Sequence, residues 1–263
     1  MPLTPEIRTD IPHSARIWNY WMGGDSNFPV DQAIGEESLK LDPDIAPMTV
    51  QCRQFLIRAV RYLAAEQGIR QFLDIGTGLP TMQNTHEVAQ SVAPESRIVY
   101  VDHDPLVLQY ARTLLTNTTD EGVTAYVNAD YYKPGQVIFD ARNILNLTRP
   151  VAVMFMGSLG HAKTHSDMLG IVRSVLDAVP SGSYLVLYDG TTDRQSYVTL
   201  CKEYAKSGGL AYHPRTPEQI RAVFDGLDLV DPGCVPVTEW RPDSTPAGTG
   251  QPVSAYCGVA RKR

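Results

Sequence analysis

The segment from Phe72 to Pro80, FLDIGTGLP, constrains the fold of this chain most strongly. An apolar strand runs into a carboxylate, Asp74, and then into two closely spaced glycines, Gly76 and Gly78. Such glycines let the backbone turn tightly and approach a ligand, and the N-terminus of a helix, expected near Thr81, would favour an anionic group. The pattern is typical of nucleotide-type sites in α/β folds, although an ordinary turn between a strand and a helix can look the same.

Two further strands with terminal acids follow this loop. Residues 98–102 (IVYVD) and 124–130 (TAYVNAD) read as buried strands that end at Asp102 and Asp130. Because the carboxyl ends of parallel strands meet along one edge of a sheet, these acids and Asp74 should face one region. A carboxylate only accepts hydrogen bonds, which suits Asp102 to a ribose diol and Asp130 to an adenine amino group. Each acid alone is also typical of a helix N-cap.

The loop also distinguishes between two classes of cofactor. A dinucleotide-binding fingerprint needs a third glycine, but Thr81 stands at that position and Leu79-Pro80 stiffens the loop. S-adenosylmethionine has no pyrophosphate, and its sulfonium cation tolerates nearby carboxylates. We therefore expect S-adenosylmethionine as the cofactor and S-adenosylhomocysteine as the product. An NAD(P)-dependent oxidoreductase is the alternative.

Predicted helices and strands alternate along the middle of the chain. The predicted helices span residues 49–67, 81–91, 105–115, a short stretch after 133, 166–179, 195–206 and 217–224, and the fourth and fifth strands span 151–156 and 184–188. Such alternation requires a parallel sheet with helices on both faces. Residues 227–240 and 253–260 read as two more strands, separated by a short loop, that should pair antiparallel.

The first 46 residues are predicted to form a helical cap, ahead of a cofactor-binding domain at 47–263. Helices are expected at 14–22 and 31–41, on either side of Gly23-Gly24. Aromatic residues at helical spacing usually pack into a core, but helices placed before the first strand of such folds can also cover the ligand.

Residues of this cap are assigned to two roles. Arg16 is the candidate partner of the methionine carboxylate, with a surface ion pair as the alternative. Acceptor binding is assigned to Tyr20, Trp21, Asn27 and Phe28.

The chain as a whole resembles class I S-adenosylmethionine-dependent methyltransferases, and among them an actinobacterial family long catalogued as a domain of unknown function. The motifs that carry the resemblance are PHSARIWNYWMGG at 12–24 with Asn27-Phe28, FLDIGTGLPT at 72–81 with NTHE at 84–87, YVDHDP at 100–105, VPSGSYLVL at 179–187, WRPD at 240–243 and GVARK at 258–262. The resemblance implies a Rossmann-like α/β fold. Its seven-stranded, mostly parallel sheet would end in an antiparallel C-terminal strand, with helices on both faces and an N-terminal helical cap.

The predicted site combines the glycine loop with the ends of the later strands. The cofactor-binding residues are predicted to be Arg16, Asp74, Gly76, Thr77, Gly78, Asp102, His103, Asp130, Tyr131 and Gly157. Methyl transfer requires mainly that the acceptor be held in line with the methyl group, plus a base if the acceptor loses a proton. His161 and Tyr188 are the catalytic candidates and Ser158 is assigned to the acceptor, although His161 could equally be a loop histidine without a role in catalysis. His161 and His165 are four residues apart, but no acidic third ligand accompanies them, so no metal site is predicted.

Amino-acid composition and net charge limit the classes of molecule that this protein is expected to bind. The net charge of −6 disfavours general binding to nucleic acids or anionic membranes, and an Asn-Pro-Pro-aromatic motif after the fourth strand is missing, which disfavours methylation of nucleic-acid bases. Four widely spaced cysteines and the lack of a signal peptide or apolar span indicate a cytoplasmic protein. We expect a monomer or homodimer that methylates a small molecule, such as a specialised metabolite. A protein that binds the cofactor without methylating is the non-enzyme alternative.

Overall fold

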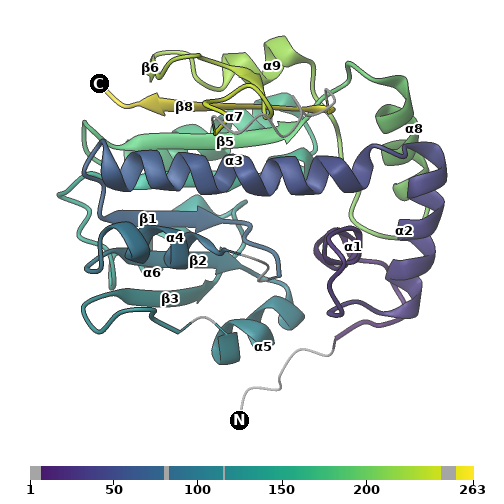
Figure 1. Ribbon diagram of the computed structural model, residues 1–263, viewed down its shortest axis with the longest axis horizontal. Helices are drawn as coiled ribbons and strands as arrows, with labels where there is room; N and C mark the ends of the chain where they lie inside the picture. Colours follow the sequence, from purple (N-terminus) through teal and green to yellow (C-terminus); the bar gives the residue numbers. More distant parts are fainter. Residues whose placement is uncertain (1–6, 80–82, 115, 244–252) are drawn as a thin grey trace.

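A mostly parallel sheet forms the centre of the protein in the computed structural model, which describes residues 7–79, 83–114, 116–243 and 253–263. The strand order is β3-β2-β1-β4-β5-β8-β6, and β7 also pairs with β8 (Figure 1). The parallel strands are β1 (Gln71–Ile75), β2 (Arg97–Asp102), β3 (Val123–Asn128), β4 (Ala152–Met156) and β5 (Tyr184–Gly190). The antiparallel strands are β6 (Asp228–Leu229), β7 (Val235–Pro236) and β8 (Ala255–Arg261).

The predicted antiparallel closure is confirmed, but the predicted edge strand at 227–240 is divided in two. Leu229 lies opposite Ala260, and Pro236 lies opposite Tyr256. Between them the chain turns at Gly233, whose φ of +97° is in the left-handed region and whose N–H donates to the Val230 carbonyl at 2.8 Å. The described residues therefore form eight strands where seven were expected, because this turn breaks the ladder.

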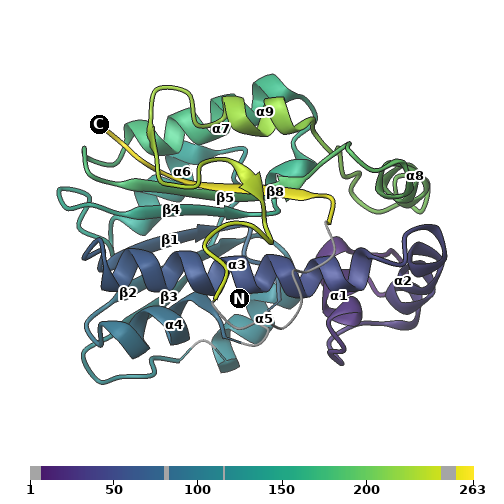
Figure 2. The same cartoon turned by 45° about the horizontal axis from the view of Figure 1, so that its top comes forward.

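Helices cover both faces of the sheet, as predicted. Helices α3 (Ile45–Ala65) and α4 (Thr85–Val92) cover one face, and α6 (Pro134–Ala141), α7 (His165–Asp177) and α9 (Pro217–Ala222) cover the other (Figure 2). Successive strand residues point to opposite faces, so Phe72 enters the core under α3 and Leu73 enters the other core. Helix α5 (Pro105–Leu114) contacts β3.

Three helices gather at the carboxyl ends of the parallel strands: α1 (Ser14–Trp21), α2 (Pro29–Leu41) and α8 (Gln195–Tyr204) (Figure 1). Helix α3 begins at Ile45, four residues before its predicted start, and extends beyond the sheet towards α2. The proposed boundary between residues 46 and 47 thus falls in the first turn of α3. The N-terminal helices and the extended end of α3 enclose the edge of the sheet where the acids were predicted to gather.

Candidate functional site

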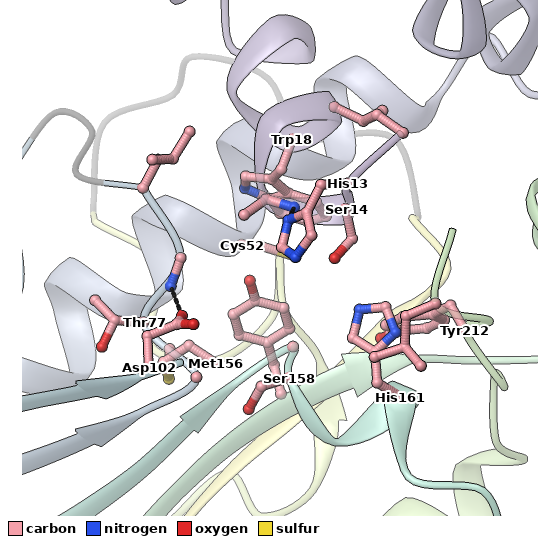
Figure 3. A pocket seen from close by; sticks show the side chains of 18 of the residues that line it. His13, Ser14, Trp18, Cys52, Thr77, Asp102, Met156, Ser158, His161 and Tyr212 are labelled. Carbon is pink, nitrogen blue, oxygen red and sulfur yellow. Dashed lines mark hydrogen bonds between the residues drawn. The ribbon is translucent and has the colours of Figure 1, made fainter. Parts of the chain in front are cut away.

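A pocket opens at this edge of the sheet. Figure 3 shows Thr77 and Asp102 at one end of it and His161 and Tyr212 at the other, with His13, Ser14 and Trp18 over the space between them. We call the part formed by residues at or just after the carboxyl ends of β1, β2 and β3 the loop half; its members include Asp74, Gly76, Thr77, Gly78, Asp102, His103, Ala129 and Tyr131. We call the remaining part the cap half; its members include Trp18, Ser158, His161, Tyr188, Tyr197, Leu200, Tyr204, Leu210 and Tyr212.

The glycine loop has the backbone conformation that its sequence predicts. Gly76 and Gly78 have φ values of +72° and +67°, in the region that favours glycine. A Cβ at Gly76 would lie only 2.4 Å from the Cβ of Ser158, so the close approach of these segments also requires glycine. Asp102 fixes the loop, because one of its carboxylate oxygens accepts a hydrogen bond of 2.8 Å from the Gly78 N–H (Figure 3).

Asp74 is a buried carboxylate with one unused oxygen. Its Oδ2 accepts a hydrogen bond of 2.7 Å from the Thr85 hydroxyl, whereas Oδ1 has no partner among the described residues. Burial raises the pKa of Asp74 to about 6, and the charge of nearby Arg53 opposes part of that rise. Arg53 also lines the pocket, and no hydrogen bond or ion pair of its guanidinium is found within the described part of the chain. An unpartnered carboxylate oxygen and an unpartnered guanidinium fit the ammonium and carboxylate of an amino-acid group.

The helix after the loop is not arranged as predicted. Thr81, where we expected it to start, lies outside the described residues, and α4 begins at Thr85. A capping box formed by Asn84 and Glu87 satisfies its first turn, and the His86 N–H donates to the Tyr100 hydroxyl at 2.8 Å. Because these N–H groups already have protein partners, they are not free to bind an anionic group as the loop sequence suggested.

The other predicted cofactor-binding residues differ in whether they line the pocket. His103, Tyr131 and Gly157 line the pocket, whereas Asp130 is half-buried beside it and accepts a hydrogen bond of 2.9 Å from the Tyr132 N–H. Gly157 has a φ of +79°, and a Cβ there would lie 2.7 Å from the Tyr188 ring. The adenine role of Asp130 remains a prediction that its position next to Tyr131 permits.

Arg16 has a different partner from the one predicted. Its Nε lies 3.0 Å from the Asp31 carboxylate, and its other two nitrogens donate to the carbonyls of Arg8 and Ile11. Arg16 is buried and does not appear among the described pocket-lining residues. It ties the chain before α1 to the start of α2, so the geometry favours Arg53 as the cation of the pocket.

The residues assigned to the acceptor divide between the pocket and the body of the cap. Trp21 and Ser158 line the pocket. Tyr20 packs over Gly35, and the side-chain amide of Asn27 donates to Asn19 Oδ1 at 2.9 Å. Phe28 starts α2 and lies under the Arg16 guanidinium, 5.1 Å from it. The structure thus gives Tyr20, Asn27 and Phe28 packing and hydrogen-bonding roles within the cap.

His161 is a half-buried imidazole in the wall of the cap half. Its Nδ1 lies 3.0 Å from the Ala211 carbonyl oxygen. Since a carbonyl only accepts hydrogen bonds, Nδ1 must carry the proton and Nε2 keeps its lone pair. Burial lowers the pKa of His161 to about 4, so the ring is neutral at physiological pH. This arrangement provides one free basic nitrogen beside the pocket.

A buried carboxylate supports the segment that holds His161. Asp189 at the end of β5 accepts hydrogen bonds from the Tyr212 hydroxyl and, at 3.0 Å, from the Gly190 N–H. Burial raises the pKa of Asp189 to about 6. The Tyr212 ring stands edge-on to His161, with ring centroids 5.1 Å apart. Tyr188, the second catalytic candidate, lines the pocket, and burial raises its pKa well above 10, so it stays protonated.

A hydrogen-bonded pair joins the cap to the loop half. The Nε2 of His13 lies 2.9 Å from Asp104 Oδ2, while His13 also caps α1 and Asp104 accepts a hydrogen bond of 2.6 Å from the Leu106 N–H at the start of α5. Burial alone would raise the pKa of Asp104, but the hydrogen bond and charge of His13 and the backbone N–H groups lower it. Both residues lie in motifs that carried the family resemblance, although neither was assigned a role.

Sequence reasoning missed Arg53 and Tyr212 as parts of the site. Arg53 lies within a helix that was predicted, but a periodic pattern does not show which residue reaches a pocket beyond the end of the sheet. Tyr212 lies in a loop without a motif, and only its contacts with Asp189 and His161 connect it to the site. Asp189 was visible as an acid at the end of a strand.

No group of three metal-ligating side chains occurs among the residues that the structure describes. No helix within those residues is long and apolar enough to cross a membrane.

The sheet order, its antiparallel closing strands and the pocket at the carboxyl ends define a class I S-adenosylmethionine-dependent methyltransferase. The model of the S-adenosyl methyltransferase family matches residues 2–263, so the chain belongs to that family. S-adenosylmethionine, rather than NAD(P), is therefore the cofactor.

Two solved structures are similar over nearly the whole chain. A DUF574 family protein from Streptomyces avermitilis shares 43% sequence identity, with a TM-score of 0.92 and coverage of 98% of this chain and 100% of that one. A candidate methyltransferase from Thermobifida fusca shares 36% identity, with a TM-score of 0.89 and coverage of 98% of each chain. None of the curated proteins matches the sequence.

Proposed function

We propose that this protein transfers the methyl group of S-adenosylmethionine to a small molecule held in the cap half, with His161 as the base. The observation that carries the proposal is Nε2 of His161, which has no partner among the described residues and belongs to a ring that the Ala211 carbonyl holds in the pocket wall. Enclosure by α1 and α8 suits a small acceptor, and the net charge of −6 disfavours a nucleic acid. A specialised metabolite is the class that the family context suggests.

The loop half is proposed to hold the cofactor in one orientation. Asp74 Oδ1 would accept a hydrogen bond from the ammonium group, and Arg53 would pair with the carboxylate. Asp102 Oδ1 already accepts hydrogen bonds from the His103 and Asp104 N–H groups, so Oδ2, which accepts one from Gly78, would bind the ribose diol with its remaining lone pair. Asp130 would reach the adenine amino group. When bound, the cofactor supplies an activated methyl group on a sulfonium.

In such a reaction, side chains of this protein exclude water, orient the acceptor and accept a proton. Aromatic side chains of the cap, including Trp18, exclude water and orient the acceptor. Nε2 of His161 takes the acceptor proton, and the Ala211 carbonyl keeps the ring in the correct tautomer. A cytoplasmic location is proposed as well, supported by four cysteines that are all free and buried.

Two measurements test the proposal. Calorimetry should detect binding of S-adenosylmethionine and S-adenosylhomocysteine but not of NAD. Incubation with S-adenosylmethionine carrying an isotopically labelled methyl group, followed by mass spectrometry of small-molecule extracts, should reveal a labelled product. Binding without any labelled product across extracts and pure candidates would favour a protein that binds the cofactor without methylating.

A further inference from the structure

We infer that the acceptor is an uncharged, largely apolar ring compound that presents one acidic hydroxyl, of the phenol or enol type, to Nε2 of His161. This inference rests on the proposed function and adds the chemical class of the molecule that receives the methyl group. Three features of the cap half carry it: the surface of its walls, the positions of charged side chains, and the single free acceptor nitrogen.

The described walls of the cap half are mainly aromatic and aliphatic. Trp18 comes from α1, Leu200 from α8, and Leu210 and Tyr212 from the segment after α8. The Tyr212 ring is edge-on to both His161 and Tyr197, with centroid distances of 5.1 and 6.3 Å. Walls of this kind bind a ligand that buries apolar surface, and rigid aromatic groups orient a flat ring better than a flexible chain.

The charged side chains that line the pocket are assigned to the cofactor or are paired with another residue. Among the described lining residues, Asp74 and Asp102 belong to the loop half, and Arg53, whose charge also acts on Asp74, is assigned above to the cofactor carboxylate. His13 is paired with Asp104 at 2.9 Å. A buried charge is unfavourable without a partner, so a phosphate ester, a carboxylate or an ammonium compound would lack a counter-charge in these walls.

The free nitrogen of His161 favours an acidic proton donor. Because Nδ1 donates to Ala211, Nε2 can only accept, which requires an O–H or N–H on the acceptor. His161 is a weak base, since burial lowers its pKa to about 4. Proton transfer from an aliphatic alcohol would be strongly unfavourable, whereas phenols and enols are far more acidic. Aliphatic amines are cations at neutral pH and fail the charge criterion.

The reaction balances with these groups alone. The acceptor oxygen forms a bond to the methyl carbon as the bond from carbon to sulfur breaks, the electron pair of that bond stays on sulfur, and the hydroxyl proton moves to Nε2 of His161. The protonated imidazole, with its low pKa, then returns the proton to solvent when the product leaves.

Three ligands with one ring system test the acceptor class by direct binding. Calorimetric titrations use the protein saturated with S-adenosylhomocysteine and compare 2-naphthol, 2-naphthoate and 2-naphthylmethylammonium. We expect naphthol to bind at least about tenfold more tightly than either charged compound. The three compounds should differ little in their affinity for the unfolded protein. A charged compound that binds as tightly as naphthol would overturn the inference.

A pair of leucine variants places the ligand in the cap half. Leu210 lines the pocket and Leu41 lies at the end of α2, and both are exposed, by 56% and 37%, so neither substitution should disturb the core. Leu210→Arg supplies the missing counter-charge and should increase naphthoate affinity about fivefold, whereas Leu41→Arg should leave it unchanged. Equal effects of the two variants would contradict the assigned location.

The two proposals can fail separately. Loss of naphthol binding with S-adenosylhomocysteine still bound would overturn only the acceptor class. Failure of S-adenosylhomocysteine to bind would overturn the proposed function as well.

Discussion

Nδ1 of His161 lies 3.0 Å from the carbonyl oxygen of Ala211, and this contact leaves Nε2 as the only basic nitrogen of the ring. The segment that provides the carbonyl is itself fixed to the sheet. Tyr212 donates a hydrogen bond to Asp189, and the His213 N–H donates to the Gly160 carbonyl at 2.7 Å. The tautomer and position of the candidate base therefore depend on a loop some fifty residues away in sequence.

Replacing His161 should lower turnover without lowering cofactor affinity. His161→Gln can keep a hydrogen bond to Ala211 but has no basic nitrogen, so kcat should fall by roughly 10² to 10⁴ once an acceptor is available. His165→Ala is the matched control, because His165 bonds to the Gln219 carbonyl and does not line the pocket. Steady-state kinetics and S-adenosylhomocysteine titrations on both variants provide the measurement, and unchanged kcat in His161→Gln removes the residue as the base.

Arg53 should recognise the carboxylate end of the cofactor. Arg53→Met removes the unpartnered guanidinium of the pocket, and we expect S-adenosylhomocysteine affinity to fall by about 1.5 to 3 kcal/mol, the range for a hydrogen bond to a charged group. Affinity for 5′-methylthioadenosine, which lacks the amino-acid end, should stay the same.

A second arginine on the same helix controls for the change of net charge. Arg61 is half exposed and pairs with Asp243 at 3.5 Å, away from the pocket, so Arg61→Met should not affect either ligand. Calorimetry on both variants checks the assignment. An equal loss of affinity for 5′-methylthioadenosine in Arg53→Met would point to a structural effect instead.

The sequence predicted the fold well because its signals are local and repeated. Apolar strands of regular length, each followed by a helix, specify a parallel sheet, and the glycine loop marks the carboxyl edge where a ligand binds. The one error in strand number arose at Gly233, where a turn divides a segment that reads as a continuous strand.

The site was predicted only in part, because it depends on contacts that no local pattern contains. Asp74 and Asp102 lie at the carboxyl ends of strands and were therefore visible, whereas Arg53 is one of several arginines on a long helix. Arg16 looked suited to a carboxylate ligand, but Asp31 and two backbone carbonyls already satisfy it. Which polar group is satisfied internally, and which faces a cavity, is decided by the tertiary structure.

Cofactor affinity should weaken in mild acid because of Asp74. Burial raises the pKa of this carboxyl to about 6, and a cofactor ammonium pairs only with the ionised form. As the pH falls below about 6, Asp74 in the free protein is increasingly protonated, and that proton must leave before the ammonium binds. The dissociation constant of S-adenosylhomocysteine should then rise by up to about tenfold per pH unit.

Two variants distinguish the effect of Asp74 on the pH dependence of cofactor affinity from the effects of other titratable groups. Asp74→Asn should bind more weakly at neutral pH and lose the dependence on pH. Asp189→Asn should retain it, because Asp189 also has a pKa near 6 but bonds to Tyr212 and does not line the pocket. Titrations with 5′-methylthioadenosine should show no acid dependence in any variant. A wild-type affinity that stays constant from pH 7 to pH 5 would exclude the proposed ammonium contact.

The two glycines of the loop should respond differently to alanine. Both have positive φ values, so each substitution strains the backbone by about 1 to 2 kcal/mol. Among the described residues, only the Cβ at Gly76 collides, at 2.4 Å from the Ser158 Cβ, whereas the nearest described atom to a Cβ at Gly78 is the Ala15 Cβ, at 3.6 Å. Denaturant unfolding should therefore show a larger loss for Gly76→Ala than for Gly78→Ala, by about 1 to 3 kcal/mol. Adding Ser158→Gly removes the collision, so the double variant, compared with Ser158→Gly alone, should recover most of that difference in stability. Equal losses of stability for the two alanine variants would mean that the loop can move away from Ser158.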